Sequence, residues 1–257
     1  MKYSYDEHER SYQRIEREGL TTWNQLHGAE SFEELANRPF LESVLPQLAL
    51  PSPDKADVLE YGCGTGQVAC FLAERGYRVR AIDLSPTAIA LARRFATERG
   101  LRIEFEVQDV CALAQESPGR RYDLIADSFC LQSIVTDRDR ADLLTAIRDR
   151  LRPSGFYLIS TAMYDGRTYG PEERYDPVSG ICELMTPAPA DRRATRDSDV
   201  CRDGVWYRPH RRHLKPAALR EELGRGGFTV IWQGGDFGGD VVCVGSDYAG
   251  RAPSLML

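Results

Sequence analysis

The sequence lacks features that membrane and secreted proteins need. Its longest stretch without Asp, Glu, Lys or Arg runs from Tyr61 to Ala73, well short of the roughly 20 apolar residues of a membrane-spanning helix. The amino-terminal segment, MKYSYDEHER, contains no apolar stretch like that of a secretory signal. We therefore expect no membrane insertion, no secretion and a cytoplasmic location.

Paired cysteines and clustered histidines are also missing. The seven cysteines are odd in number and form no C-x-x-C pair, so neither a disulfide framework nor a zinc site is indicated. There are only four histidines. His210 and His213, in WYRPHRRHLKP, lack the Glu of the H-E-x-x-H zinc motif. We expect reduced thiols, which suit the cytoplasm, and no bound metal.

The chain has no excess of positive charge. Its 33 Lys and Arg residues are outnumbered by 39 Asp and Glu residues, which gives a formal net charge of −6. Broad neutralisation of phosphates, the basis of most nucleic-acid binding, is therefore disfavoured, although a small basic patch remains open. What the 257-residue chain does have is 42% hydrophobic residues, enough for a sizeable buried core.

Strand-like and helix-like segments alternate in the middle of the chain. Expected strands cover 57–62, 78–83, 103–109, 122–128 and 155–161, and helix-compatible stretches cover 66–75, 86–99, 110–116 and 137–151. Ser85 and Pro86 form a helix start, with a capping hydroxyl followed by proline at the first helical position. Such alternation implies right-handed crossovers and a mostly parallel sheet. Residues 55–161 are thus expected to form a doubly wound α/β core.

Three segments flank this core. Residues 1–54 are expected to form a helical cap, with helices over 5–18 and 31–48, the second broken at Pro39. Residues 162–215 interrupt the pattern with ten basic and nine acidic side chains, and so long an insertion indicates a substrate lid. Residues 216–257 are expected to add a helix and an antiparallel β-hairpin that complete a seven-stranded sheet.

A glycine loop follows the first strand directly, in the sequence Glu60-Tyr61-Gly62-Cys63-Gly64-Thr65-Gly66. Glycines allow a sharp turn and bring the backbone close to a ligand at the carboxyl end of the sheet. The dinucleotide fingerprint needs glycine at the sixth position, where this chain has Gln67. Glu60 would repel a pyrophosphate but would tolerate a ligand with an ammonium group. A nicotinamide-dependent oxidoreductase is therefore disfavoured.

Acidic residues also end the next three strands. Asp83 comes about twenty residues after the loop, where such a residue accepts hydrogen bonds from ribose hydroxyls. Asp109 ends the third strand, within reach of an adenine amino group, and Asp127 ends the fourth. Each alone would be an ordinary loop acid. Together with Glu60, they indicate a ligand site along the carboxyl edge of the sheet.

The motifs LEYGCGTG, AIDLSP and VQDV, together with the turn LRPSG, resemble those of the class I S-adenosylmethionine-dependent methyltransferases. The resemblance covers about residues 55–161 and extends with the hairpin to about 246. Within the superfamily it is nearest to bacterial small-molecule methyltransferases, and the run from Asp127 to Thr161 is similar to the branch that methylates tellurite and thiols.

The resemblance implies S-adenosylmethionine as cofactor and a role for each matching residue. Glu60 and the loop of Gly62, Cys63, Gly64 and Gly66 would hold the methionine moiety. Asp83 would bind the ribose, while Leu84, Asp109 and Val110 would enclose the adenine. Asp127 and Phe129 would face the methionine end. Cys63 would contribute its backbone rather than a nucleophile.

Catalytic residues cannot be taken from the resemblance, because methyl transfer chiefly needs alignment of the acceptor and exclusion of water. A general base is required only for an acceptor that is protonated. The candidates are His210, His213 and Gln132, with Ser133 beside it. The histidines could equally belong to an exposed loop that caps the following helix. Tyr3, Tyr5 and Tyr12 could close over the cofactor.

The aromatic residues of the insertion have two interpretations: a box around a cationic or planar acceptor, or a small core that any lid of this length needs. The set comprises Tyr164, Tyr169, Tyr175, Trp206 and Tyr207.

The leading hypothesis is a methyltransferase acting on a small molecule, as a monomer or homodimer, with no nucleic-acid or membrane partner. A nucleic-acid methyltransferase is one alternative, although DSFC at 127–130 lacks the Pro-Pro-aromatic run typical of those enzymes. The other alternative is a sensor or scaffold that binds the cofactor without transfer.

Overall fold

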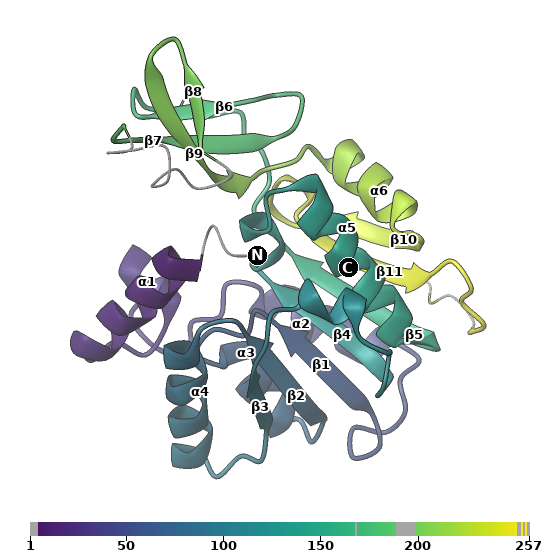
Figure 1. Cartoon of the computed structure of the whole chain (residues 1–257). Coiled ribbons are helices and arrows are strands. Elements are labelled where there is room, and N and C mark those ends of the chain that lie inside the picture. The colour runs from purple at the N-terminus through teal and green to yellow at the C-terminus, as the bar shows by residue number, and fades with distance from the viewer. Residues whose placement is uncertain (1–4, 168, 189–198, 251–252, 254, 256–257) are drawn as a thin grey trace.

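A seven-stranded sheet forms the centre of the computed structural model, which describes residues 5–167, 169–188, 199–250, 253 and 255 (Figure 1). The strand order is β10-β11-β5-β4-β1-β2-β3. The strands are β1 Asp57–Tyr61, β2 Arg78–Asp83, β3 Glu104–Val107, β4 Tyr122–Ser128, β5 Leu151–Ser160, β10 Phe228–Gly234 and β11 Asp240–Gly245. The doubly wound α/β fold with its carboxyl-terminal hairpin is thereby confirmed.

The first five strands are parallel to one another, and β11 runs antiparallel to both β5 and β10. The hairpin therefore places β11 between β5 and β10. Because β1 lies between β2 and β4, the chain moves outward in opposite directions from it. This switch in strand order creates a crevice at the carboxyl ends of β1 and β4, where open α/β sheets bind their ligands.

Helices cover both faces of the sheet (Figure 1). Their bounds are α1 Tyr5–Arg17, α2 Arg38–Val44, α3 Gln67–Glu74, α4 Pro86–Glu98, α5 Asp137–Arg150 and α6 Pro216–Arg225, with 3-10 turns η1 Trp23–His27, η2 Leu45–Gln47, η3 Ala112–Gln115, η4 Leu131–Ser133 and η5 Asp236–Gly238. The Ser85 hydroxyl caps α4 as expected, accepting the backbone N–H of Ala88 at 3.0 Å.

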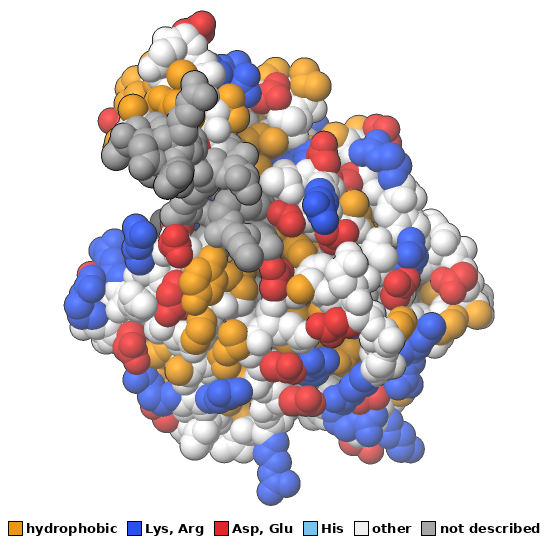
Figure 2. All heavy atoms as spheres, viewed as in Figure 1, with side chains coloured by type: hydrophobic (Ala, Val, Ile, Leu, Met, Phe, Trp, Pro, Cys, Tyr) orange, Lys and Arg blue, Asp and Glu red, His pale blue; other side chains and the backbone are white. Residues whose placement is uncertain are grey.

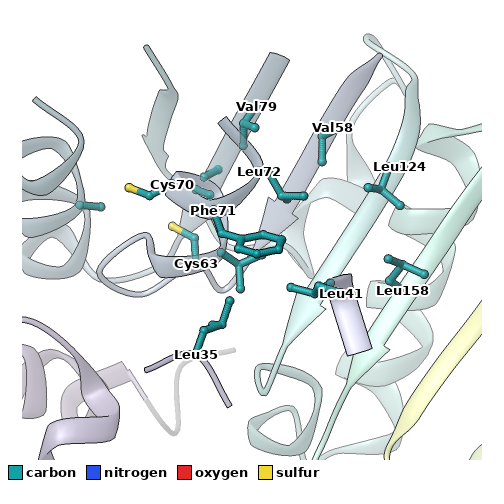
Figure 3. Packing of buried hydrophobic residues seen from close by; sticks show 14 of the residues in the cluster. Leu35, Leu41, Val58, Cys63, Cys70, Phe71, Leu72, Val79, Leu124 and Leu158 are labelled. Atoms are coloured by element: carbon teal, nitrogen blue, oxygen red, sulfur yellow. The ribbon is translucent and has the colours of Figure 1, made fainter. Parts of the chain in front are cut away.

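The apolar core has two layers, one on each face of the sheet. On one face, Leu35 and Leu41 of the amino-terminal segment lie around the ring of Phe71 in α3 (Figure 3). Strand residues Val58 and Leu124 belong to the same cluster. The amino-terminal segment is thus packed into the core beside the glycine loop.

The insertion forms a second sheet, which the sequence did not predict. Its four antiparallel strands, in the order β6-β7-β9-β8, are β6 Glu173–Tyr175, β7 Ile181–Thr186, β8 Val200–Arg202 and β9 Val205–Arg212. Strand β9 contacts η4, directly after β4. The small sheet therefore stands at the carboxyl edge of the main sheet (Figure 1).

Several predicted boundaries were wrong. The helix expected over 31–48 is the shorter α2, continued by the turn η2, and Pro39 lies in the first turn of α2, where the missing N–H of proline costs nothing. Proline therefore begins this helix and does not break it. The helix expected over 110–116 is the short turn η3, and β5 begins four residues earlier than expected, at Leu151.

Candidate functional site

The glycine loop between β1 and α3 is closely packed against neighbouring side chains. Gly62 has a φ of +61°, and a Cβ atom there would lie 2.3 Å from Sγ of Cys130. Gly64 has a φ of +53°, and its Cβ would lie 2.7 Å from the hydroxyl of Tyr12. Both positions need glycine for backbone conformation and for space.

Asp83, at the end of β2, fixes this loop. Its Oδ2 accepts the backbone N–H of Gly64 at 2.9 Å, and its Oδ1 accepts that of Ser85 at 2.8 Å. Burial raises the pKa of Asp83 to about 6, although both hydrogen bonds oppose that rise. Each carboxylate oxygen retains a second lone pair, so Asp83 can also accept hydroxyl groups of a ligand.

Glu60, at the end of β1, is 1% exposed. Its Oε2 atom has no hydrogen-bond partner among the described residues. Burial raises the pKa of Glu60 well above its usual value, and the nearby acids Asp83 and Asp127 raise it further. A backbone hydrogen bond from Ala69 opposes this rise, but a buried oxygen left without a partner is still costly. A cationic donor placed beside it would restore the ionised form and supply the missing hydrogen bond.

Helix α1 covers the loop from one side. The Glu9 carboxylate accepts the Ser85 hydroxyl at 2.6 Å and also that of Thr87, which joins α1 to the start of α4. Tyr12 is buried, and its ring packs against that of Trp23 with centroids 5.4 Å apart. The possibility that Tyr12 closes over the site agrees with this position, whereas Tyr3 lies outside the described residues.

Strand β9 of the small sheet supplies the facing wall. His210 Nδ1 lies 3.3 Å from a carboxylate oxygen of Glu7 in α1, and the Arg211 guanidinium lies 3.7 Å from the same oxygen. Burial alone would raise the pKa of Glu7, but His210 and Arg211 outweigh it and lower the pKa to about 2. Charged contacts of Glu7 with His210 and Arg211 therefore connect helix α1 to strand β9.

These elements enclose a cavity of about 460 Å³. The predicted residues that line it are Tyr12, Glu60, Gly62, Cys63, Gly64, Asp83, Leu84, Phe129, Gln132, Ser133, His210 and His213. Four other predicted residues, Gly66, Asp109, Val110 and Asp127, do not line it. The structure thus brings together the residues of the first, second and fourth strand ends with the insertion.

The four residues outside the lining have other positions. Gly66 precedes α3 with a φ of +83°, packed close to Ala92 and Phe105. Asp109 accepts the backbone N–H of Cys111 at 2.9 Å, beside the buried Val110. Asp127 Oδ1 accepts the backbone N–H of Cys130 at 2.9 Å and so holds the turn after β4. Burial raises the pKa of Asp127 to about 8.

Both insertion histidines line the cavity. The loop alternative is wrong for His210, which lies on a strand, while His213 does lie in the loop before α6 but is half-buried. His210 lies on β9 and His213 directly follows it. Burial lowers the pKa of His213, which favours the neutral form of its ring. Gln132 lies in η4, and its Oε1 accepts the backbone N–H of Ala162 at 2.6 Å. It thereby ties the loop after β4 to the loop after β5.

Some lining residues were not predicted, among them His8, Trp23 and Arg211. Burial lowers the pKa of His8 to about 4, and its ring packs edge-on against Trp23 at 5.6 Å. The sequence offered one signal for this group, an aromatic and charged amino-terminal helix ahead of the first strand. Arg211 had no signal beyond its place between the two histidines.

Three tyrosines of the insertion stack on one another and lie away from the cavity lining. Tyr175 lies between Tyr164 and Tyr169, with ring centroids at 4.6 and 5.1 Å and nearly parallel planes. None of the three lines the cavity, so their arrangement matches the small-core interpretation.

Burial raises the pKa of Cys63 and Cys130 well above the usual value, which keeps both thiols protonated.

Two further features concern the described part of the chain alone. No three His, Cys, Asp or Glu side chains within it are grouped so as to hold a metal ion. No helix within it has the length and apolar character needed to cross a membrane.

Comparison with known proteins gives a family. Residues 58–155 match the family described as methyltransferase domain. A protein of Xylella fastidiosa (strain M23) described as ubiquinone biosynthesis O-methyltransferase is 30% identical over 165 residues, which cover 63% of this chain and 64% of that protein. A protein with the same description from Xanthomonas euvesicatoria pv. vesicatoria is 32% identical over 139 residues, which cover 54% of this chain and 55% of that protein. The chain thus spans less than two thirds of these relatives.

Solved structures agree with the fold. The CcbJ methyltransferase from Streptomyces caelestis matches with a TM-score of 0.63 and 17% identity, covering 85% of this chain and 94% of that one. The glycopeptide N-methyltransferase MtfA matches with a TM-score of 0.54 and 26% identity, covering 84% and 90%. With its sheet order and glycine loop, the matched region 58–155 is therefore a methyltransferase domain, similar to those of the class I S-adenosylmethionine-dependent methyltransferases.

Proposed function

We propose that this protein transfers a methyl group from S-adenosylmethionine to a small-molecule acceptor. The observation that carries the proposal is the buried Glu60 Oε2, which has no hydrogen-bond partner among the described residues, beside a glycine loop that borders the cavity. The cosubstrate of the family carries an ammonium group and no phosphate. The site residues therefore fit it.

The roles of the binding residues follow from their positions. Glu60 would pair with the ammonium group, and the backbone of Gly62 and Gly64 would lie along the methionine moiety. Asp83 would accept the ribose hydroxyls, with Leu84 against the adenine. Asp109 and Val110, outside the enclosed cavity, would border the adenine at the end of β3. Asp127 would act on the site through the turn that places Phe129.

S-adenosylmethionine supplies a methyl group already activated by its sulfonium charge. The protein must align the acceptor and exclude water. Helix α1 and strand β9 would perform the second task, because Tyr12 and Arg211 both border the cavity. His213 stays a catalytic candidate, although burial lowers its pKa and so weakens it as a base, whereas the His210 ring is occupied by Glu7. Gln132 is placed to orient an acceptor.

Relatives support a small-molecule acceptor without identifying it. The curated relatives are described as O-methyltransferases of ubiquinone biosynthesis and MtfA as a glycopeptide N-methyltransferase. These descriptions differ in both the acceptor and the atom methylated.

Calorimetric titration with S-adenosylmethionine and S-adenosylhomocysteine tests the proposal. We expect micromolar binding by the wild type and about 10- to 100-fold weaker binding by Asp83→Ala, the loss expected for hydrogen bonds to a charged group. Asp247→Ala, an exposed aspartate outside the cavity, is the matched control. Failure of the wild type to bind, or equal binding by Asp83→Ala, would contradict the proposed site. Formation of S-adenosylhomocysteine with an acceptor panel then separates an enzyme from a sensor that binds without transfer.

A further inference from the structure

A second cavity, of about 510 Å³, adjoins the first. It lies between α2, the loops that follow β4 and β5, and the turn between β10 and β11. The residues that line it are Ala36, Asn37, Pro39, Phe40, Phe129, Thr161, Ala162, Met163, Asp165, Gly235, Asp236, Phe237, Gly239 and Asp240. None of the roles assigned above uses this space.

The two cavities share Ala36 and Phe129 in their linings. Phe129 has a φ of +60°, which is rare for a residue with a side chain and costs free energy. Its N–H donates to the carbonyl oxygen of Ser160 at 2.7 Å, which stabilises this backbone conformation. A strained aromatic residue thus stands where a methyl donor in the first cavity would meet a molecule in the second.

The second cavity is acidic. Asp165, Asp236 and Asp240 line it, and no Lys, Arg or His is among its described lining residues. Asp165 is partly neutralised, since its charge interacts with that of Arg167. Asp236 is exposed at the mouth, and Asp240 is half-buried. Phe40, Phe129 and Phe237 add aromatic surface, and Phe237 is 61% exposed. Carboxylates combined with aromatic faces are the surroundings that bind organic cations.

A buried amide oxygen provides an independent sign of a missing ligand. Asn37 is 4% exposed, and its Oδ1 has no hydrogen-bond partner among the described residues. Its Nδ2 donates to the Ser160 hydroxyl at 3.0 Å, and that hydroxyl donates to Asp240 Oδ1 at 2.7 Å. This chain of hydrogen bonds fixes the amide with its oxygen as the spare acceptor. The spare acceptor and the acidic group at the other end are both suited to an N–H donor.

We propose that the second cavity is the acceptor subsite and that it selects an acceptor with a protonatable amine. The proposal rests on the methyl transfer proposed above and goes further by naming the chemical class of the acceptor. Asp240 and Asp236 would attract the ammonium form, while Asn37 would take one N–H and fix its direction. The aromatic residues would hold the carbon skeleton.

Transfer to such an acceptor balances without another reactant. The ammonium gives one proton to the Asp240 carboxylate, whose pKa burial has raised. The freed nitrogen lone pair forms a bond to the methyl carbon, while the carbon–sulfur bond breaks and its electron pair stays on sulfur. The products are a methylated ammonium and S-adenosylhomocysteine, and Asp240 then returns its proton to solvent.

The test uses a panel of arylalkyl and alicyclic amines, each paired with the alcohol and the thiol of the same carbon skeleton. Binding is measured by calorimetry on the full chain saturated with S-adenosylhomocysteine, and turnover is measured with S-adenosylmethionine. We expect at least one amine to bind and react at least tenfold better than its alcohol and thiol. Asp240→Asn and Asp236→Asn should each weaken that preference at least threefold, and Asp247→Asn should leave it unchanged.

Each alternative outcome has a definite meaning. Preference for an alcohol or a thiol, binding of no amine, or an amine preference unchanged in both Asp240→Asn and Asp236→Asn would overturn the amine assignment while leaving methyl transfer intact. If the wild-type protein does not bind S-adenosylmethionine, that result would instead overturn the proposed function. If Asp240→Asn fails to fold, Asp236→Asn still tests the amine assignment, because the Asp236 side chain is exposed.

Discussion

Gly62 shows how one missing side chain serves two purposes at the residue scale. Its positive φ satisfies the turn after β1, and its lack of a Cβ leaves room for Cys130. The cavity depends on both, because Cys130 and Gly62 each line it. The two effects can be separated by comparison with Gly76, which has a φ of +88° and where an added Cβ would meet only Pro53, at 3.5 Å.

We expect Gly62→Ala to lower the free energy of unfolding by about 2–5 kcal/mol, the sum of left-handed strain and overpacking. Gly76→Ala introduces only the left-handed strain and should lower the free energy of unfolding by about 1–2 kcal/mol. Urea unfolding measures both. Adding Cys130→Gly to Gly62→Ala should recover the steric part. Equal losses in the two single variants would show that the contact with Cys130 does not constrain the loop.

The acidity of Asp83 gives a second prediction at this scale. Its raised pKa of about 6 means that the free site is protonated below that pH. A cationic ligand with hydroxyl donors favours the ionised form, so binding below pH 6 must expel the proton. Affinity for S-adenosylmethionine should therefore fall as pH drops through 6, by up to about tenfold per pH unit for one proton.

Calorimetry in two buffers of different ionisation enthalpy measures that proton release directly. Asp83→Asn should remove the part of the pH dependence that belongs to this group. An affinity that stays constant between pH 5 and pH 7 would contradict the assignment of Asp83 to the ligand.

At the scale of elements, the site depends on two that the sequence separates widely. Helix α1 and strand β9 meet through Glu7, His210 and Arg211. Neither belongs to the α/β core, yet together they enclose its ligand crevice. We expect binding and release to involve their separation, so this contact should influence the rate of release.

We expect Glu7→Gln to raise the dissociation rate of S-adenosylhomocysteine about two- to fivefold, the effect of losing a partly exposed ion pair. Stopped-flow tryptophan fluorescence can follow release, because Trp23 lines the cavity. Glu16→Gln, an exposed position on the same helix, is the matched control and should leave the rate unchanged. Identical rates in Glu7→Gln and Glu16→Gln would mean that the two elements do not restrain release.

Prediction from the sequence succeeded for the core elements and failed for the insertion, for a physical reason. Strands β1 and β4 are buried along nearly their whole length, so they stand out along the chain. All eight residues of β9 are only half-buried, and Pro209 sits in its middle opposite a register shift. A strand without alternation gives no period-two signal. Likewise, Glu60 and Asp83 were found from their strand ends, whereas His8 and Arg211 join the site through distant packing.

At the scale of the whole molecule, the formal net charge is −6. Basic and acidic side chains are interspersed over the face shown in Figure 2. This face therefore offers no extended basic surface for phosphates. The absence of a nucleic-acid partner stays a prediction, as does the choice between monomer and homodimer.

The position of β11 between β5 and β10 has a consequence for synthesis on the ribosome. Strand β5 ends at Ser160 and its partner begins at Asp240, so at roughly 5–20 residues per second the partner emerges about 4–16 s later. During that interval the apolar run Phe156–Ile159 is the open edge of a nascent sheet, a template for pairing with other chains. Yield of the protein in cells should therefore depend on translation speed and chaperone supply over the codons that follow β5.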